Sequence, residues 1–198
     1  MDRIPESYQL WSSLGIDWNG NPCRVVAGSG VSCSQPWKSL RGGLDRAQGC
    51  LLGQLAGDSL GALVEFQGPK EISETYPHEV SSLADGGTWN TIAGQPTDDS
   101  EMALLLARML VVKGSYDLDG AAERYRFWLD SEPFDCGHTI RQGLRGRPNL
   151  QSQANGALMR ISPLGIFGAG RDREEVGEWA LESAGLMGGP LESYTSPG

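Results

Sequence analysis

The feature that most constrains the fold of this chain is a row of glycines spaced four residues apart. They lie in the segment 44–66, whose apolar residues recur at helical rather than strand spacing. The row consists of Gly49, Gly53, Gly57 and Gly61. Each glycine inside a helix costs about 1 kcal/mol relative to alanine. Because the step of four places them on one side of a helix, we expect a closely packed neighbour, another helix or a ligand, to offset that cost.

Helical periodicity continues through most of the chain beyond this segment. A polar, glycine-rich stretch at 67–96 reads as a loop. Pro148 and Pro163 interrupt the pattern and weaken the evidence for helices around them. The further helices that we expect are 97–114, 117–131, 134–147, 153–168 and 172–185. No strand pair or internal repeat stands out, so the sequence predicts an all-α fold.

The domain boundaries follow from where this periodicity starts and stops. Residues 1–43 have no sustained period, and we expect a loop-rich N-terminal extension there. Residues 44–186 are expected to form a compact multi-helix domain, and 187–198 an irregular tail. The total of 198 residues suits one domain.

Charge and cysteine usage narrow the classes of function. The net charge of −9 disfavours binding to nucleic-acid backbones. The four cysteines form no CxxC pair and have no zinc-ribbon spacing, which favours reduced thiols. The first residues do not resemble a signal peptide, and no apolar run reaches membrane-spanning length. We therefore expect a cytoplasmic protein without membrane or nucleic-acid partners.

Two carboxylates lie towards the end of the glycine-bearing segment. Asp58 and Glu65 are seven residues apart, about two helical turns, and would share one face of a helix. A carboxylate buried on an apolar helix is unfavourable unless it is paired or liganded. Glu65 is thus either a solvent-exposed residue at a helix end or a carboxylate placed beside a substrate.

Thr97, Asp98 and Asp99 follow directly after Pro96. A threonine followed by acidic residues is ordinary chemistry for the start of a helix. A hydroxyl and two carboxylates are also hard oxygen ligands, suited to Mg²⁺, Mn²⁺ or Ca²⁺. Neighbouring side chains on a helix diverge by about 100°, so they would contact two ions, or one ion and its waters.

Four motifs, in order along 44–183, resemble the ADP-ribosylglycohydrolases. They read GCLLGQLAGDSLGALVEF, AGQPTDDSEMALLLARML, DCGHTIRQGL and ANGALMRISPLGIFG. The resemblance implies an all-α fold that binds a pair of Mg²⁺ or Mn²⁺ ions. It also implies hydrolysis of the glycosidic bond that joins ADP-ribose to a protein side chain or a small molecule.

The resemblance assigns metal and catalytic roles to residues of two motifs. Thr97, Asp98 and Asp99 match the metal-binding triplet of the family. Glu65 matches the glutamate that lies near the scissile ribose, and we expect Glu65 and Asp99 to be catalytic. Glu65 would act as general base or hold the attacking water.

The other two motifs carry the expected substrate contacts. Asn155 and Gly156 match a segment that lines the ADP-ribose cleft. Arg160 belongs to the same motif, and its side chain is expected either to form a structural salt bridge or to contact the ligand. Residues 135–138 match the start of a D-I-G-N-T motif, in which His138 replaces the asparagine.

The resembled family takes its remaining metal ligands from a C-terminal Asp-x-Asp-Thr segment, which is absent after residue 160. Asp117 and Asp119 have the Asp-x-Asp spacing, but they stand at the start of an expected helix, where acidic residues are common.

The sequence leaves two main hypotheses for the function. The first is a glycohydrolase whose chain is shortened or is completed by another polypeptide. The second is a non-catalytic remnant or an ADP-ribose-binding module. A Mg²⁺-dependent phosphohydrolase is a third. In a shortened domain, the apolar faces of 97–112 and 158–167 would lack partners and favour self-association.

Overall fold

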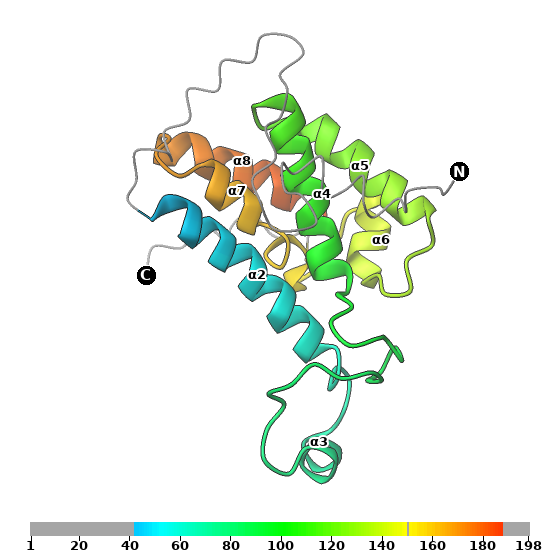
Figure 1. Ribbon diagram of the computed structural model, residues 1–198. Coiled ribbons are helices and arrows are strands. Elements are labelled where there is room, and N and C mark those ends of the chain that lie inside the picture. Colours follow the sequence, from blue (N-terminus) through cyan, green and yellow to red (C-terminus); the bar gives the residue numbers. More distant parts are fainter. Residues whose placement is uncertain (1–41, 150, 188–198) are drawn as a thin grey trace, which may run out of the picture.

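The computed structural model describes residues 42–149 and 151–187, and they form helices joined by loops (Figure 1). The elements are α2 (Gly43–Gly61), α3 (Pro69–Thr75), α4 (Asp98–Lys113), α5 (Leu118–Asp130), α6 (His138–Leu144), the 3₁₀ helix η2 (Asn155–Ala157), α7 (Ser162–Phe167) and α8 (Arg173–Gly185). Within these ranges the only β-pairing is a single bridge between Gly86 and Thr91. The predicted all-α fold is confirmed.

The core is built around α4, which packs against α5 and α7. Met102, Leu106 and Met109 of α4 are completely buried. The predicted lack of a partner for the apolar face of 97–112 is therefore wrong, because α5 and α7 cover it. Leu164 of α7 is buried in the same core, so the face of 158–167 is also partly covered.

Local signals in the sequence set several helix boundaries. Gly114, with φ +69°, ends α4 in the left-handed conformation that glycine adopts without steric cost. The Asp117 side chain accepts a hydrogen bond from the Gly120 N–H, and Asp172 accepts from the first turn of α8 in the same way. Asp117 is thus an N-cap residue, as its position predicts.

Arg160 joins three elements from a completely buried position. Its guanidinium donates to the Gly156 carbonyl at 3.0 Å, the Tyr125 hydroxyl at 2.7 Å and the Ser183 carbonyl at 2.8 Å. It also lies over the Tyr125 ring, 4.6 Å from the centroid. Among the described residues no carboxylate pairs with Arg160, and the partners that the structure gives it are neutral. Neutral oxygens and an aromatic ring satisfy the arginine and tie α5, η2 and α8 together.

Three helices differ in length from their predictions. The helix expected over 44–66 ends at Gly61, and residues 62–66 form turns. The helix expected over 134–147 is confined to α6, and the one over 153–168 divides into η2 and α7. In each case, turns and loops with locally satisfied backbone groups replace the predicted helical ends.

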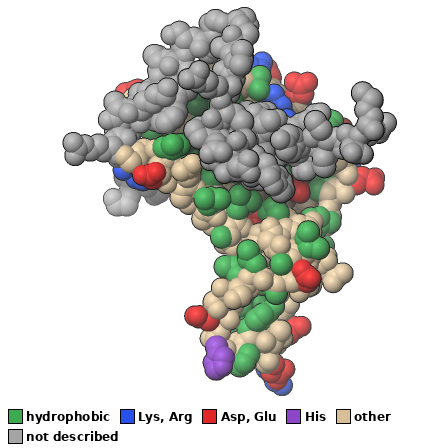
Figure 2. All heavy atoms as spheres, in the orientation of Figure 1, with side chains coloured by type: hydrophobic (Ala, Val, Ile, Leu, Met, Phe, Trp, Pro, Cys, Tyr) green, Lys and Arg blue, Asp and Glu red, His purple; other side chains and the backbone are tan. Residues whose placement is uncertain are grey.

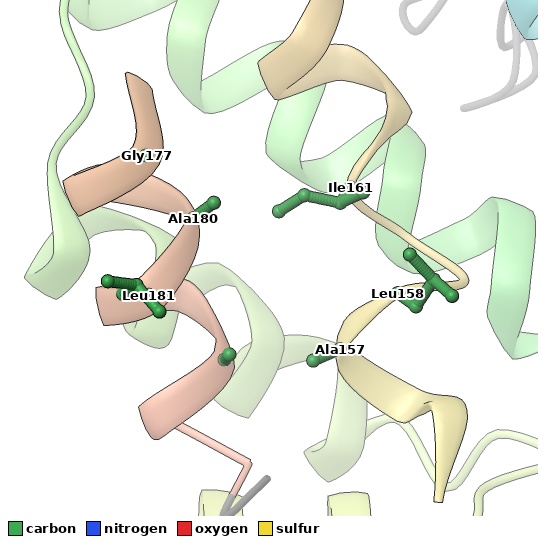
Figure 3. Close-up of a pocket in the computed structure, with 7 residues that line it drawn as sticks. Ala157, Leu158, Ile161, Gly177, Ala180 and Leu181 are labelled. Atoms are coloured by element: carbon green, nitrogen blue, oxygen red, sulfur yellow. The ribbon is translucent and has the colours of Figure 1, made fainter. Parts of the chain in front are cut away.

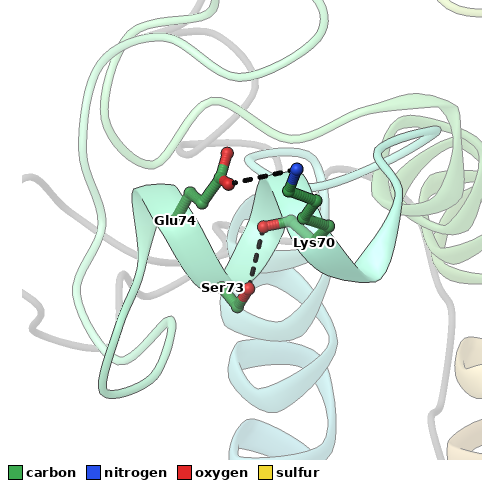
Figure 4. A network of polar contacts seen from close by, with 3 residues as sticks. All are labelled: Lys70, Ser73 and Glu74. Carbon is green, nitrogen blue, oxygen red and sulfur yellow. Dashed lines mark hydrogen bonds and ion pairs between the residues drawn. The ribbon is translucent and has the colours of Figure 1, made fainter.

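The stretch predicted as a loop, 67–96, contains α3, which projects away from the other helices (Figure 1). Lys70 and Glu74 form an ion pair of 3.8 Å on α3, and Ser73 donates to the Lys70 carbonyl at 2.8 Å (Figure 4). Both charged side chains are exposed, so the pair contributes little to stability. Figure 2 shows hydrophobic side chains on the surface of this projecting part, where Leu83 and Ile92 are exposed.

The glycine row of α2 differs most from its prediction. Gly49, Gly53, Gly57 and Gly61 are all exposed, and a Cβ added at any of them would meet no described atom within 4 Å. Leu52, on the same helix, is 63% exposed. The expected closely packed neighbour is therefore absent from the part of the protein that the structure describes. Helices α4 and α7 contact other sides of α2.

Parts of the terminal predictions lie outside the described residues. Gly43 already belongs to α2, and the structure does not describe 1–41. Met187, predicted to be in the irregular tail, is instead buried in the core. Gly143 permits this packing, because a Cβ there would lie 2.8 Å from Met187 Cα. The rest of the tail, 188–198, is not described. No helix in the described ranges has the length and apolar character needed to cross a membrane.

Candidate active site

Asp58 links α2 to the start of α4. Its carboxylate accepts hydrogen bonds from the Thr97 N–H at 3.1 Å, the Thr97 hydroxyl at 2.6 Å and the Ser100 N–H at 3.1 Å. Thr97 occupies the N-cap position of α4, but its own side chain makes no capping bond. Asp58 therefore caps α4 from another helix, a role that its place in the sequence did not reveal.

Asp98 and Asp99 begin α4 beside this contact. Asp98 is buried and accepts a hydrogen bond from the Gly137 N–H at 3.3 Å. Burial raises the pKa of Asp98, and repulsion from Glu65 and Asp58 adds to the effect. Burial, with repulsion from Asp98 next, raises the pKa of Asp99 to about 6. The first turn of α4 thus concentrates negative charge.

Asp135 lies in the same electrostatic cluster. Burial raises its pKa to about 7, and repulsion from Asp98, Glu65 and Asp99 contributes further. Asp135 lies two residues before Gly137, whose backbone N–H donates to Asp98. The segment before α6 therefore lies close to the start of α4. The resemblance to the ADP-ribosylglycohydrolases includes residues 135–138. The helical periodicity of the sequence does not indicate that Asp135 joins the acidic cluster.

Glu65 lies in the turn after α2 rather than on the helix. The Trp89 indole N–H donates to Glu65 Oε2 at 2.8 Å, and the Thr88 hydroxyl donates to the Glu65 carbonyl. Gly87 makes this approach possible: its φ is +72°, and a Cβ there would lie 2.6 Å from the Ala62 carbonyl oxygen. The sequence did not predict the contact between Trp89 and Glu65, because residues 67–96 have no periodic pattern.

Asn155 and Gly156 begin a separate element, η2. Gly156 is buried, and a Cβ there would lie 2.9 Å from Ile140 Cγ1, so packing accounts for the glycine. Asn155 is exposed, and its carbonyl accepts from Leu158 and Met159. His138 is exposed at the first residue of α6. Substrate contacts by Asn155 and Gly156 stay predictions.

Thr97, Asp98 and Asp99 carry oxygen donors of the type that a hard divalent cation prefers. The ligand set is incomplete: across the described ranges no three His, Cys, Asp or Glu side chains are arranged to hold an ion. The donor chemistry of the triplet fits Mg²⁺ or Mn²⁺, and further ligands would have to come from elsewhere.

An apolar pocket of about 290 Å³ lies apart from the acidic cluster. It lies between α8 and the segment containing η2 and Ile161, with Ile161 and Ala180 facing one another across it (Figure 3). Its lining residues carry no ionisable side chains: Ala157, Leu158, Ile161, Gly177, Ala180, Leu181 and Ala184. The pocket therefore lacks the acid–base groups expected of a hydrolase site.

Comparison with known proteins places these features in a family. The ADP-ribosylglycohydrolase family model matches residues 40–193. ADP-ribosyl-[dinitrogen reductase] glycohydrolase from Rhodospirillum rubrum is 38% identical over 150 residues, which cover 71% of this chain and 50% of the relative. ADP-ribosylarginine hydrolase Tri1 from Pseudomonas putida (strain GB-1) is 31% identical over 141 residues, covering 63% of this chain and 36% of the relative.

A solved structure of an ADP-ribosylglycohydrolase-related protein complex has a similar fold. Its TM-score is 0.63 at 29% sequence identity, covering 78% of this chain and 54% of that one. The chain spans half or less of the length of the curated relatives described above. Since the family match extends over most of the chain and includes the acidic cluster, this protein belongs to the ADP-ribosylglycohydrolase family.

Proposed function

We propose that this chain takes part in hydrolysis of the glycosidic bond that joins ADP-ribose to a protein side chain or a small molecule. The observation that carries the proposal is the convergence of Glu65, Asp98, Asp99 and Asp135 into one field of mutually repelling carboxylates. Two of the relatives described above, ADP-ribosyl-[dinitrogen reductase] glycohydrolase and ADP-ribosylarginine hydrolase Tri1, support the same reaction class.

Glu65 is suited to proton transfer in this reaction. The Trp89 N–H occupies one carboxylate oxygen, Oε2, and holds the side chain in a defined orientation. The other oxygen can accept a proton from an attacking water. Departure from the anomeric carbon passes through an oxocarbenium-like state, which the attacking water then captures.

Divalent cations form part of the proposal. Thr97, Asp98 and Asp99 would contribute oxygen ligands to a pair of Mg²⁺ or Mn²⁺ ions, with the remaining ligands supplied from outside the described residues. Such ions orient a ribose diol and lower the pKa of bound water. Bound cations would also relieve the repulsion that adds to burial in raising the pKa of Asp99.

The partner in this proposal is an ADP-ribosylated protein or an ADP-ribose-containing small molecule. Asn155 and Gly156 are proposed to contact the ADP-ribose portion, with no role for nucleic acid or a membrane. A cytoplasmic location belongs to the same proposal, and the free thiols of Cys50 and Cys136 agree with a reducing compartment. Self-association through the apolar faces of 97–112 and 158–167 stays a prediction, and Val111, Val112 and Leu158 are the exposed apolar side chains on these segments.

The test is release of ADP-ribose from an ADP-ribosylated peptide in the presence of Mg²⁺ or Mn²⁺. We expect Glu65→Gln to reduce the rate by about two to four orders of magnitude, the usual contribution of a general base. Glu71→Gln, at an exposed position of α3, is the matched control and should leave the rate unchanged. Binding of ADP-ribose without turnover would instead select the binding-module alternative. Phosphate release from simple esters would select a phosphohydrolase.

A further inference from the structure

The side-chain amide of Gln54, on α2, links three segments of the protein. Its Nε2 donates to the Asp99 carbonyl at 3.1 Å and to the Met159 carbonyl at 2.8 Å. Its Oε1 accepts a hydrogen bond from the Ser162 hydroxyl. Asp99 lies in the first turn of α4, Met159 follows η2, and Ser162 begins α7. The contacts span 45, 105 and 108 residues, so only the folded chain brings these groups together.

The three partners also fix the orientation of the Gln54 amide. A primary amide carries two N–H donors on its nitrogen, and its oxygen is an acceptor. In the reverse orientation the oxygen would face two carbonyl oxygens, and none of these atoms can donate. In the observed orientation each N–H has an acceptor and the oxygen has a donor. Gln54 is half-buried, and a matched polar network in such surroundings favours a single geometry.

Gln54 and Asp58 together hold the start of α4. They are four residues apart on α2 and therefore lie on the same side of the helix. Asp58 accepts hydrogen bonds from the Thr97 and Ser100 N–H groups, whereas Gln54 donates to the Asp99 carbonyl. One side chain thus holds donors of this turn and the other holds an acceptor. The two contacts restrain both the position and the rotation of the turn that carries the proposed metal ligands.

The second carbonyl ties this turn to the segment that is proposed to contact ADP-ribose. Met159 lies two residues after the end of η2, and its own N–H donates to the Asn155 carbonyl at 3.0 Å. A single nitrogen atom of Gln54 therefore lies within hydrogen-bond distance of the first turn of α4 and of the segment that contains Asn155. One side chain sets the distance between the two.

We infer that Gln54 is a positioning residue, which holds the proposed metal ligands of α4 at a fixed distance from the η2 segment. Gln54 donates to backbone carbonyls, so it acts through Asp99 and Met159. This inference rests on the proposed function, since it concerns the metal and substrate groups assigned there. Groups that orient metal ligands change the affinity for the metal about 10- to 100-fold. Because Gln54 contacts the backbone of Asp99, we expect the lower end of this range.

The direct test replaces the Gln54 amide with methionine, a side chain of similar length that cannot donate a hydrogen bond. Mn²⁺ alone is titrated into the chain without substrate, and the free ion is measured by electron paramagnetic resonance. We expect Gln54→Met to weaken Mn²⁺ binding about ten-fold. Gln48→Met, the same change at an exposed position of α2, is the matched control and should leave the affinity unchanged. Unchanged affinity for Mn²⁺ in Gln54→Met, with the fold confirmed by circular dichroism, would overturn the inference.

Ser162→Ala separates positioning from a general loss of stability. It removes the donor that fixes the orientation of the Gln54 amide, and we expect Mn²⁺ binding to weaken about two- to three-fold. In the Gln54→Met background the same change should weaken binding no further, because Ser162 acts through Gln54. Additive losses in the double variant would contradict the inference. So would variants that melt at a lower temperature but bind Mn²⁺ as the unmodified chain does.

A second arm separates this inference from the proposed function. Release of ADP-ribose from an ADP-ribosylated peptide is measured at saturating Mn²⁺. We expect kcat of Gln54→Met to stay about ten-fold below that of the unmodified chain, because the ions remain displaced from the η2 segment. Full recovery of kcat would contradict a role in setting this distance.

Failure of the proposed function has a different signature. The unmodified chain then binds Mn²⁺ but releases no ADP-ribose, and Gln54→Met still weakens Mn²⁺ binding, which supports the positioning role. An unmodified chain that binds no Mn²⁺ would overturn the inference.

Discussion

Helices α2 and α4 have similar apolar periodicity but opposite surroundings. In α4, seven residues are buried, whereas Ser59 is the one buried residue of α2 among the described side chains. The glycines of α2 face outwards, and α4 lies between α5 and α7. The apolar periodicity of the sequence thus predicts that a helix forms, but not how many of its faces pack against other elements. The acidic cluster lies where these two helices meet, at the contact between Asp58 and Thr97.

The largest effect should come from removing a core side chain of α4. Leu106 is completely buried in the main hydrophobic cluster. We expect Leu106→Ala to lower the free energy of unfolding by about 3 kcal/mol, because it leaves a cavity. Leu52→Ala on the exposed side of α2 is the control and should change it by less than about 0.5 kcal/mol. Urea denaturation measures both, and equal effects would erase the contrast between the helices.

The junction between the two helices should be the next most sensitive position. Asp58→Ala removes an acceptor that serves two backbone N–H groups and a hydroxyl at the start of α4. We expect a loss of about 2 kcal/mol, near the upper end for an N-cap residue. Asp45→Ala, in the exposed first turn of α2, should cost far less. Thermal denaturation compares the two variants. An unchanged melting temperature in Asp58→Ala would show that α4 does not depend on this cap.

The acidic cluster should make the metal-free protein less stable as the pH rises. The pKa of Asp135 is raised from 3.8 to about 7 and that of Asp99 from 3.8 to about 6. Between pH 3.8 and these raised pKa values, the folded state therefore holds more protons than the unfolded state. The free energy of unfolding falls as the pH rises through this range. Allowing for solvent screening, we expect about 1 kcal/mol from Asp135. Asp135→Asn should flatten the dependence of the urea midpoint on pH between 4 and 8, whereas an unchanged slope would contradict the assignment.

The smallest effect tests the open side of α2. Gly57 is exposed in the helix, and a Cβ there would meet no described atom within 4 Å. We expect Gly57→Ala to stabilise the protein by about 0.5–1 kcal/mol through helix propensity. Gly143→Ala should act in the opposite direction, because its Cβ would lie 2.8 Å from the Leu186 carbonyl oxygen. Destabilisation by Gly57→Ala would mean that a neighbour occupies the glycine row after all.

The expected site was only partly predictable from the sequence. Thr97, Asp98 and Asp99 stand together in the sequence and remain together at the start of α4, because neighbouring residues cannot separate. Asp135 joins them through the contact of Gly137 with Asp98, which spans 39 residues. Trp89 reaches Glu65 because Gly87 lets one loop lie directly on another turn. Neither contact has a periodic signature along the chain.

By itself, the sequence determined the helical class, the end of α4 at Gly114 and the capping role of Asp117. These features depend on hydrogen bonds and backbone conformations within a few residues, so local residue types decide them. Tertiary structure alone decided the outward direction of the glycine row, the neutral partners of Arg160 and the position of Glu65. Those features depend on which distant segments fill the space around a side chain, and residue spacing along one helix does not contain that information.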